Sequence, residues 1–498
     1  MDQASLPSTN PAKALGDALD EIAQRTAEAG RKVSEKHRKA FAQYFTPMPV
    51  AQQMADMLDV PAKAKVGDYG AGAGILGATV LGHSVADCSA NEQCSDLHLQ
   101  AYEVDDLLHQ AFHMNVARIA DLARELWQPA PTTSLKGDFV PEAPNILGKD
   151  FEPFLDVAIL NPPYKKLHQQ SPLAKLLRDK AAPAPNLYAA FILLAVRCLK
   201  KDGQLVAIVP RSFCNGDYFR QFRAWLKSEG SIDWLVRYKR RSNVFRADNV
   251  LQENVIFRFR KGAEQKATVR VSLSTDPETP PEMDTIVPRE YVLPVDDDRI
   301  YVPSSESEIA AIQANRQLPC SFEDLGLVIG TGKFEEFRVR DSLTDHPPTN
   351  GDWAPMVYAH HWERGSRKVK WTPAVNGKAA CVSLPCSRLS QRLVDAGYYV
   401  ILKRISANDD RTGRVHPAVV TPECLPGDRW AFENHIQVIG PARGKTMTKT
   451  MAEGLAGFLA SSDVDQVLKS ISGTTQINCN DIRRLRYPGR HELNACTL

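Results

Sequence analysis

The 498-residue sequence predicts an α/β protein, in which a predominantly parallel sheet with helices on both faces precedes a second domain of mixed α+β structure. Three observations predict this class. Between about residues 65 and 261, short runs of β-forming residues alternate with longer helical stretches. A glycine-rich turn follows the first run and opens an apolar helix. Beyond residue 315, strands, turns and basic clusters mix without an internal repeat.

Six short runs are the strand candidates of the first domain. The helical stretch that follows Asn186 has an amide suited to capping it and basic residues in its last turn. Because this stretch is apolar nearly all round, we expect it to pack against the sheet. Residues 13–40 carry apolar residues at helical spacing and predict a helical lead-in. The six runs are VGDYG, LQAYEV, DVAIL, QLVAIV, DWLVRY and ENVIFRF, which begin at residues 66, 99, 156, 204, 233 and 253.

Charge and proline content divide the chain into four parts. Residues 1–40 are the lead-in and residues 41–262 the first domain, and together they carry a formal charge of +4. Residues 263–314 carry −7 and six prolines, which predicts an acidic surface connector with VRVSL and EYVLPV as edge-strand candidates. Residues 315–498 carry +5 and form the second domain. Mild basicity permits a nucleic-acid partner but does not demonstrate one.

Composition excludes several classes of protein. The longest strongly apolar run, Tyr188–Val196, has nine residues, well short of the roughly 20 that cross a bilayer. The N-terminus shows no basic region followed by an apolar block, so no secretory signal is expected. The ten cysteines include no C-x-x-C pair, which favours free thiols over a metal site or disulfides. We therefore expect a soluble intracellular protein with no metal and no membrane partner.

The turn after the first strand candidate has glycine at alternate positions, Gly70, Gly72 and Gly74, and Asp68 lies just before them. Glycines permit positive φ and a close approach of backbone to ligand, which a strand-to-helix turn around a cofactor requires. Alone, such a loop is compatible with a nucleotide-type cofactor or with an ordinary tight turn. It does not match G-x-x-x-x-G-K-[ST], so a phosphate-cradling loop is disfavoured.

Acidic residues follow the next two strand ends. Glu103 lies near the end of LQAYEV, about 30 residues beyond the glycines, where a carboxylate can accept hydrogen bonds from both hydroxyls of a ribose. The stretch KGDFV presents Asp138, suited to an adenine amino group, and Phe139, whose face suits the adenine ring. Each acid alone is more simply a solvated carboxylate at a strand end. Their order along the chain favours three strand ends that contact one adenosine.

The strand candidate DVAIL runs directly into Asn161, Pro162, Pro163 and Tyr164. Two prolines after a strand stop the sheet and stiffen a turn whose carbonyls have no competing N–H donors. An amine conjugated to a ring or carbonyl is a poor nucleophile, because its lone pair is delocalised. The Asn161 side-chain oxygen and the Pro162 carbonyl would orient its N–H bonds and turn the lone pair toward an electrophile. Tyr164 would stack on the planar substrate.

In these motifs the sequence resembles the S-adenosylmethionine-dependent amino methyltransferases, and more narrowly the gamma-type N6-adenine DNA methyltransferases of bacterial type II restriction-modification systems. The family's motif order is kept over most of the chain, with AQYFTP before DYGAGAG and NPPY after it. The resemblance implies a role for each matching residue. Tyr44, Thr46, Pro47, Asp68, Gly70 and Gly72 would contact the methionine part of the cofactor, Glu103 the ribose, and Asp138 and Phe139 the adenine; Asn161, Pro162, Pro163 and Tyr164 would be the catalytic motif, with Phe245 on the opposite face of the flipped base.

The resemblance implies a Rossmann-like seven-stranded methyltransferase sheet with helices on both faces, plus a mixed α+β C-terminal target-recognition domain. The implied reaction is transfer of a methyl group from S-adenosylmethionine to the N6 amine of an adenine flipped out of duplex DNA. The implied partners are double-stranded DNA and a separately encoded cognate restriction endonuclease. The expected location is the cytoplasm of a bacterium, in association with the nucleoid.

Three alternatives remain open. Amino methyltransferases that act on a protein glutamine or an rRNA guanine also use an NPP-aromatic turn, although the FTP motif and the roughly 235 residues after the catalytic half favour DNA. A catalytically silent DNA-binding module could have inherited the same shape. A fused endonuclease is disfavoured, because the sequence has no convincing P-D with a spaced acid-x-Lys set and His360-His361 lacks the surroundings of a metal-dependent nuclease.

Overall fold

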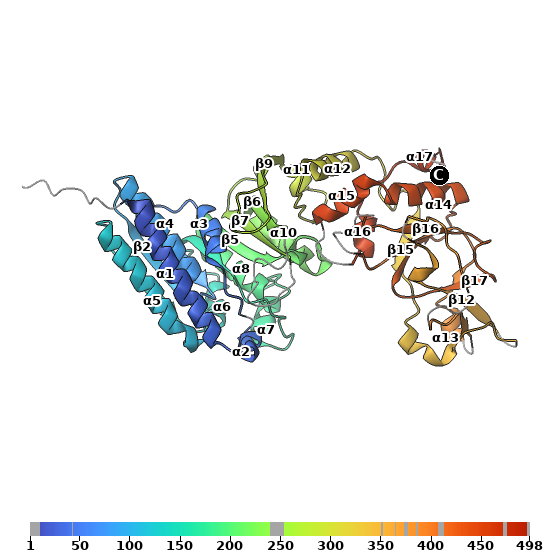
Figure 1. Ribbon diagram of the computed structural model, residues 1–498, viewed down its shortest axis with the longest axis horizontal. Helices are drawn as coiled ribbons and strands as arrows, with labels where there is room; N and C mark the ends of the chain where they lie inside the picture. The colour runs from blue at the N-terminus through green and yellow to red at the C-terminus, as the bar shows by residue number, and fades with distance from the viewer. Residues whose placement is uncertain are drawn as a thin grey trace, which may run out of the picture. The chain divides into compact units, whose positions relative to one another are not determined.

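The chain divides into two compact units, Met1–Ser304 and Ser305–Leu498, each with its own sheets and helices (Figure 1). The structure is a computed structural model, and it describes residues 10–41, 43–239, 253–349, 352–363, 365–372, 377–384, 387–406, 413–471 and 476–495.

A nine-stranded sheet forms the centre of the first unit, in the order β3-β2-β1-β4-β5-β7-β6-β8-β9. Neighbouring strands from β3 to β5 are parallel, whereas β7 lies between β5 and β6 and is antiparallel to both. All six predicted runs fall in strands, which confirms the α/β class with a mostly parallel sheet. The strands are β1 (Lys63–Tyr69), β2 (Asp96–Tyr102), β3 (Thr132–Lys136), β4 (Leu155–Leu160), β5 (Leu199–Pro210), β6 (Gly230–Tyr238), β7 (Asn254–Lys261), β8 (Thr268–Ser274) and β9 (Met283–Pro288).

The predicted connector differs from the structure, because its first half extends the sheet by two strands beyond the seven expected. VRVSL lies in β8, which pairs parallel to β6, and β9 pairs antiparallel to β8. Val269 and Val271 are buried, while Arg270 between them donates to Asp284 across the strand pair, with Nε and Oδ1 2.8 Å apart. The edge strand expected in EYVLPV is wrong, because that stretch begins in the short helix α11 (Arg289–Val292). In this stretch, the alternation of buried and exposed side chains decides which segments join the sheet, and the acidic charge of the stretch does not.

One face of the sheet is covered by α3 and α4, and α1 and α5 pack against α4 and against each other (Figure 1). Alternate residues of β4 and β5 join their core, among them Val157, Ile159, Val206 and Ile208. The lead-in thus packs within the first unit. These helices are α1 (Pro11–Lys32), α2 (Glu35–Phe41), α3 (Met48–Asp56), α4 (Ile75–Ala90) and α5 (Asp106–Glu125).

Helix α8 (Leu187–Cys198) contacts β1, β4 and β5 and contributes no residue to that core, which places it on the opposite face. Its cap is the predicted one, since the Asn186 side chain accepts a hydrogen bond from the Ala189 N–H at 3.0 Å. Most of its residues are buried, as its apolar surface predicts. The remaining helices of this unit are α6 (Ala143–Ile146), α7 (Pro172–Asp179), α9 (Ser212–Asn215), α10 (Arg220–Glu229) and α11.

The strand order reverses between β1 and β4, which are neighbours in the sheet although β2 and β3 come between them in sequence. Ligands of open α/β sheets bind beyond the carboxyl ends of the strands at such a reversal. Gly70 directly follows β1 and Asn161 directly follows β4. The topology therefore brings the glycine loop and the NPPY turn to one edge.

The second unit has the mixed α+β structure that the sequence predicts. Four strands form a sheet in the order β10-β18-β15-β16, and five form another in the order β11-β13-β12-β17-β14. Helix α12 packs against α15, and α14 packs against α17. The strands are β10 (Leu327–Thr331), β11 (Leu343–Thr344), β12 (Trp353–Val357), β13 (Cys381–Ser383), β14 (Val394–Asp395), β15 (Tyr399–Lys403), β16 (Pro417–Val420), β17 (Arg429–Phe432) and β18 (Ile436–Pro441); the helices are α12 (Glu306–Arg316), α13 (Ser387–Ser390), α14 (Lys449–Leu459), α15 (Ser462–Ile471), α16 (Cys479–Arg483) and α17 (Arg490–Ala495).

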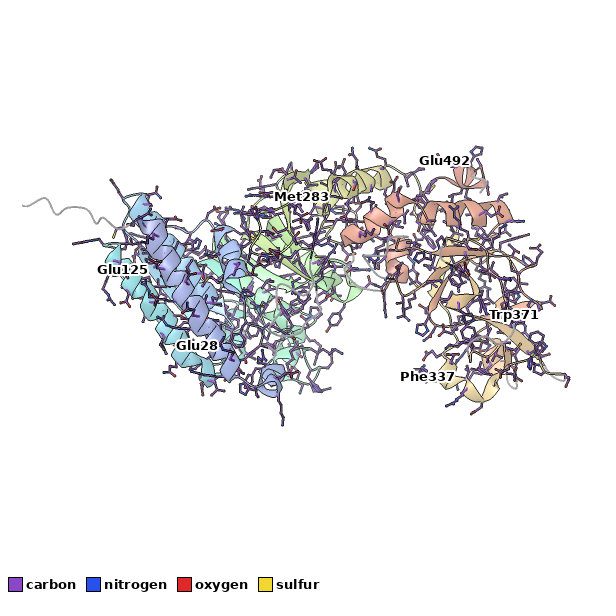
Figure 2. All side chains as sticks on the ribbon, viewed as in Figure 1. Glu28, Glu125, Met283, Phe337, Trp371 and Glu492 are labelled. Atoms are coloured by element: carbon purple, nitrogen blue, oxygen red, sulfur yellow. The ribbon has the colours of Figure 1, made fainter. Side chains whose placement is uncertain are left out.

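Side chains cover both units densely (Figure 2). Within the described ranges, no helix combines the length and the apolar character that a membrane crossing requires. Across the same residues, no three or more His, Cys, Asp and Glu side chains are grouped to hold a metal ion. The eight cysteines in that part of the chain are all free thiols.

Candidate active site

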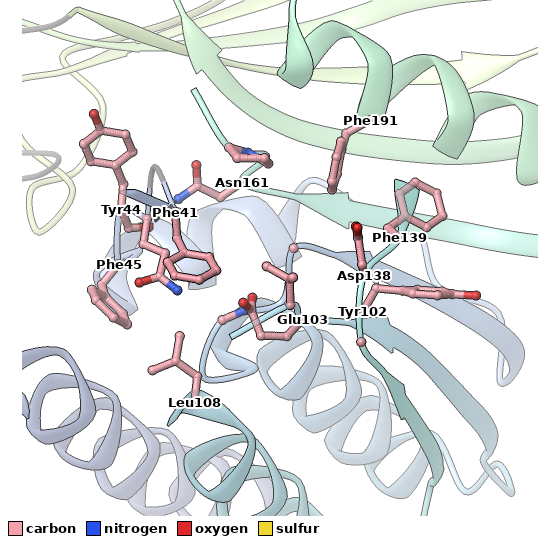
Figure 3. Close-up of a pocket in the computed structure, with 16 residues that line it drawn as sticks. Phe41, Tyr44, Phe45, Tyr102, Glu103, Leu108, Asp138, Phe139, Asn161 and Phe191 are labelled. Atoms are coloured by element: carbon pink, nitrogen blue, oxygen red, sulfur yellow. Dashed lines mark hydrogen bonds between the residues drawn. The ribbon is translucent and has the colours of Figure 1, made fainter. Parts of the chain in front are cut away.

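A cavity opens at the carboxyl ends of β1 to β4 (Figure 3). Phe245 lies outside the described residues. Eight residues singled out in the sequence line the cavity: Tyr44, Gly70, Gly72, Glu103, Asp138, Phe139, Asn161 and Pro163. Five others lie outside the lining: Thr46, Pro47, Asp68, Pro162 and Tyr164.

The glycine loop brings backbone close to the catalytic turn. Gly70 has a φ of +91°, and its N–H donates to the Tyr102 carbonyl at 2.8 Å. A Cβ at Gly70 would stand 3.7 Å from Pro163 and 4.0 Å from the main-chain oxygen of Asn161. These are ordinary van der Waals distances, so it is the positive φ that favours glycine at this position.

Glu103 is held rigidly at the cavity wall. Its Oε2 accepts a hydrogen bond from the Gly72 N–H at 2.7 Å, and its Oε1 accepts one from the Asp105 N–H at 2.8 Å. Burial raises the pKa of Glu103 above its ordinary value, although these two backbone donors lower it in part. Each oxygen keeps a lone pair, so the carboxylate can also accept from the hydroxyls of a ribose.

Asp68 lies beneath the glycine loop, fully buried. Its Oδ2 accepts from the Gly77 N–H near the start of α4 at 2.9 Å, whereas its Oδ1 accepts no hydrogen bond from the described residues. Burial raises its pKa to about 7; the Gly77 hydrogen bond lowers it and the charge of Glu103 raises it further. An unsatisfied buried carboxylate oxygen is costly, and it suits a site that receives a cationic ligand.

Aromatic rings close the side of the cavity next to Asp138. Phe139 stacks on Tyr69 with ring centroids 4.2 Å apart, and Phe191 from α8 meets its edge at 5.3 Å. Asp138 is exposed, and its Oδ1 accepts from the Val140 N–H at 2.9 Å. This corner therefore offers a carboxylate beside an aromatic wall, which is the combination expected for an adenine ring.

The Asn161 carboxamide has a defined orientation. Its Nδ2 donates to the Tyr44 main-chain carbonyl at 2.9 Å and to the Thr46 hydroxyl at 3.0 Å. Figure 3 shows the amide nitrogen directed toward the segment that carries Tyr44. Because a carbonyl can only accept, the nitrogen must occupy this position. The Asn161 Oδ1, which accepts no hydrogen bond from the described residues, is left for an incoming N–H donor.

Tyr164 differs from the arrangement expected for a ring that stacks on substrate. Its hydroxyl donates to the Ile208 carbonyl at 3.0 Å, and its ring stacks on Tyr44 with centroids 5.2 Å apart. The ring edge of Tyr188 packs against it at 6.0 Å. Tyr164 thus supports Tyr44, and it is Tyr44 that borders the cavity.

Eight lining residues were not predicted from the sequence. Tyr102 and Val104 flank Glu103, and Gly137 precedes Asp138, so proximity to a motif could have indicated them. Phe41 precedes the AQYFTP motif, and Gln43 and Phe45 lie within it, so the same proximity could have indicated them. Leu108 comes from α5 and Phe191 from α8, where an apolar residue in a helix carries no signal of a cavity.

Relatives of known class match almost the whole chain. The family model for the Eco57I restriction-modification methylase matches residues 131–245, which include the NPPY turn. The Type II methyltransferase M.PstI of Providencia stuartii is 31% identical over 490 residues, which are 96% of this chain and 92% of that protein. The Type II methyltransferase M.BsuBI of Bacillus subtilis is 31% identical over 465 residues, 91% of this chain and 89% of that protein.

Two solved structures complete the comparison. The Type IIL restriction-modification enzyme MmeI, in complex with DNA, aligns with 95% of this chain and 66% of its own, with a TM-score of 0.48 and 12% identity. A Listeria monocytogenes protein, described as a class I S-adenosylmethionine-dependent methyltransferase, aligns with 47% of this chain and 67% of its own, with a TM-score of 0.35 and 18% identity. On its 31% identity to relatives matched over nearly their full length, the chain belongs to the Type II methyltransferases of restriction-modification systems.

Proposed function

We propose that this chain is a site-specific adenine methyltransferase, which transfers a methyl group to the N6 amine of an adenine flipped out of duplex DNA. Methylation of DNA within a restriction-modification system follows from the family. The adenine specificity is our inference. The observation that supports it is the Asn161 carboxamide, oriented with Oδ1 available to an amine and placed beside the glycine loop in one cavity.

S-adenosylmethionine is the methyl donor of the family, and the cavity's residues fit it. Glu103 suits the ribose hydroxyls, Asp138 and Phe139 suit the adenine, and the glycine loop leaves room for the methionine part. The buried carboxylate of Asp68 adds negative charge beneath that loop, which complements a cationic donor. When bound, the cofactor supplies an electrophilic methyl group carried by a sulfonium.

The chain's own contribution to transfer is to orient the amine. The Asn161 Oδ1 accepts one N–H and the Pro162 carbonyl accepts the other, so that the nitrogen lone pair turns toward the cofactor. A neutral carboxamide is a poor base, so Asn161 holds the amine but does not deprotonate it. The proton leaves to water after the nitrogen has been alkylated, when it has become acidic. No general base is needed for this chemistry.

A base inside a duplex cannot reach this cavity, because its amine is paired and its faces are stacked. Extrusion costs a few kcal/mol and must be compensated by contacts with the flipped base. Tyr44 at the cavity, supported by Tyr164, and Phe245 are the aromatic residues that we assign to this capture. We assign target recognition to residues 315–498, whose basic clusters would hold the DNA backbone while polar side chains read base edges.

Two further partners follow from this proposal. A separately encoded endonuclease would recognise the same sequence, and its cleavage would be blocked by the methyl group in the major groove. Binding to chromosomal DNA would associate the chain with the nucleoid of a bacterial cell.

The test uses the purified chain with S-adenosylmethionine labelled in the methyl group, offered separately to duplex DNA, RNA and protein. Labelled DNA is digested to nucleosides and separated by liquid chromatography. The proposal predicts label in N6-methyladenine alone, and none with Asn161→Ala. Label in a methylated cytosine would contradict adenine specificity. Label only in RNA or only in protein would favour the guanine or glutamine methyltransferase alternatives and would overturn the proposal.

A further inference from the structure

The chain that crosses from the cofactor side of the cavity to Asn161, residues 43–46, is here called the strap. We propose that Thr46 in this strap is a positioning residue for methyl transfer: with the Tyr44 carbonyl, it fixes the Asn161 carboxamide so that Oδ1 faces the target amine. This inference rests on the proposed function. It gives Thr46 a different role from contact with the methionine part of the cofactor, which the family resemblance implied.

The hydrogen bonds define the role. The Asn161 Nδ2 donates to two oxygens at once, the Tyr44 carbonyl at 2.9 Å and the Thr46 Oγ1 at 3.0 Å. If the carboxamide rotated by half a turn, its Oδ1 would face the Tyr44 carbonyl with no hydrogen between them, and Nδ2 would present donors to a substrate that itself donates. The rotated side chain could not hold an amine. The Tyr44 carbonyl, which can only accept, therefore excludes the inactive orientation, and the Thr46 hydroxyl adds a second hydrogen bond that holds the carboxamide in the active one.

Thr46 contacts Asn161 directly, with its Oγ1 3.0 Å from the Asn161 Nδ2. Its side chain is buried and absent from the cavity lining, whereas Asn161 borders the cavity. Pro47 follows at the N-cap of α3, and a proline restricts the residue before it to extended backbone. The proline thus limits the backbone conformations of Thr46, and with them the positions that its hydroxyl can take.

The other end of the strap is tied to the cofactor wall through Asp105. The Gln43 Nε2 donates to the Asp105 Oδ2 at 2.7 Å, and the His37 ring lies 2.8 Å from the same oxygen. The Asp105 N–H in turn donates to Glu103, the acid that we assign to the ribose. Burial of Asp105 raises its pKa, but the hydrogen bonds from Gln43 and His37 outweigh this and lower it overall. One ionised side chain therefore anchors the strap beside the cofactor.

The test compares Thr46→Val, which keeps the shape and removes the hydroxyl, with Thr46→Ser, which keeps the hydroxyl. Two quantities are measured for each: the dissociation constant of S-adenosylmethionine by calorimetry, and the single-turnover rate of methyl transfer at saturating cofactor and DNA. We expect Thr46→Val to lower the rate by about tenfold to a hundredfold while the dissociation constant changes less than about twofold. We expect Thr46→Ser to stay within about threefold of the unsubstituted rate.

A matched control separates positioning from a general loss of packing. Thr79 in α4 is at least as buried as Thr46, and its hydroxyl bonds to the Ile75 carbonyl at 2.7 Å and the Met48 sulfur at 3.7 Å but not to Asn161. Thr79→Val should leave the transfer rate unchanged. Equal losses of rate in both valine variants would overturn the inference, as would a Thr46→Val variant that transfers normally at saturation but binds the cofactor weakly.

A second variant keeps the test decisive if Thr46→Val does not fold. Gln43→Leu removes the tie to Asp105 and should lower the transfer rate by about threefold to tenfold, more than it weakens cofactor binding. An unchanged rate at saturation would overturn the inference. The product that the unsubstituted chain forms shows whether the proposed function fails or only this inference. If that chain methylates no exocyclic amine, the proposed function fails; if it forms N6-methyladenine and the strap variants do so equally fast, only this inference fails.

Discussion

The cofactor wall and the catalytic turn, on two sides of one cavity, are built by different means. Glu103 is fixed by the N–H of Asp105, two residues further on, and by the N–H of Gly72 in the loop after the neighbouring strand β1. Asn161 is fixed by groups more than a hundred residues earlier in the chain, the Tyr44 carbonyl and the Thr46 hydroxyl. The first arrangement forms once the neighbouring strands β1 and β2 pair. The second requires the strap to be in place, so the catalytic side depends on a longer-range assembly.

This contrast predicts that the two sides can be separated by substitution. Asn161→Ala should give the largest effect, because it removes an acceptor that acts chiefly as the amine becomes nucleophilic. The transfer rate at saturation should fall by about a thousandfold, equivalent to about 4 kcal/mol, while the cofactor's dissociation constant stays within about twofold. Rapid-quench single turnovers and calorimetry measure the two quantities. A variant that loses cofactor binding but retains the rate would place Asn161 on the cofactor wall.

Glu103→Gln should weaken cofactor binding more than it lowers the saturated rate of methyl transfer. An amide can accept from only one of the two N–H groups that the carboxylate satisfies, and it loses the charge that strengthens bonds to ribose hydroxyls. The dissociation constant of S-adenosylmethionine should rise by roughly tenfold to a hundredfold, with a smaller change in the saturated rate. Asp138→Asn is the comparison: because Asp138 is exposed, its loss should be several times smaller. An equal rise in the dissociation constant for both variants would contradict the expectation that the buried Glu103 contributes more to binding than the exposed Asp138.

The smallest expected effect is a pH dependence that belongs to the cofactor wall alone. Because burial raises the pKa of Asp68 to about 7, the side chain is largely protonated below pH 7 and charged above it. The charged form attracts a cationic ligand, so cofactor affinity should increase as pH rises from 6 to 8, by about tenfold if only the charged form binds. Asp68→Asn removes this contribution, and the difference between the two titrations isolates it from the ligand's own ionisation. If the cofactor affinity of Asp68→Asn changes with pH in the same way as that of the unsubstituted chain, Asp68 is not the cause of the pH dependence.

The same carboxyl has an effect on stability in the absence of cofactor. Its folded-state pKa lies above the ordinary value of 3.8, so the folded chain binds the proton more tightly than the unfolded chain does. Its stabilising contribution is complete below pH 3.8 and is lost as pH rises toward 7. A bound cationic cofactor would offset part of that loss.

The sequence predicts one half of the site better than the other. The end of a strand is encoded by residues next to it in the sequence. The alternation of short β runs with helices then determines which of these ends reach the same edge of the sheet. The positions of Gly70, Glu103, Asp138 and Asn161 around one cavity thus follow from the order of strands and turns along the chain. The hydroxyl of Thr46 could not be assigned to Asn161, because the contact joins segments 115 residues apart and no periodicity encodes it.

Other elements show the same limit. Phe191 lies on a helix whose apolar surface predicts packing, and the sequence does not reveal that one ring also borders the cavity. The alternation of Val269 and Val271 predicts β8 as an edge-strand candidate, but nothing in the sequence indicates β9, which pairs with β8 and makes it an interior strand. Charge describes what faces water, and burial decides which segments join a sheet.

A crystal structure with sinefungin, a non-reactive analogue in which a carbon-bound amine replaces the sulfonium methyl, tests the central claim most directly. The account predicts the ribose hydroxyls of the analogue on Glu103, its adenine against Phe139, and its amine in contact with the Asn161 side chain. An analogue bound elsewhere, or bound in this cavity with its amine remote from Asn161, would contradict the account.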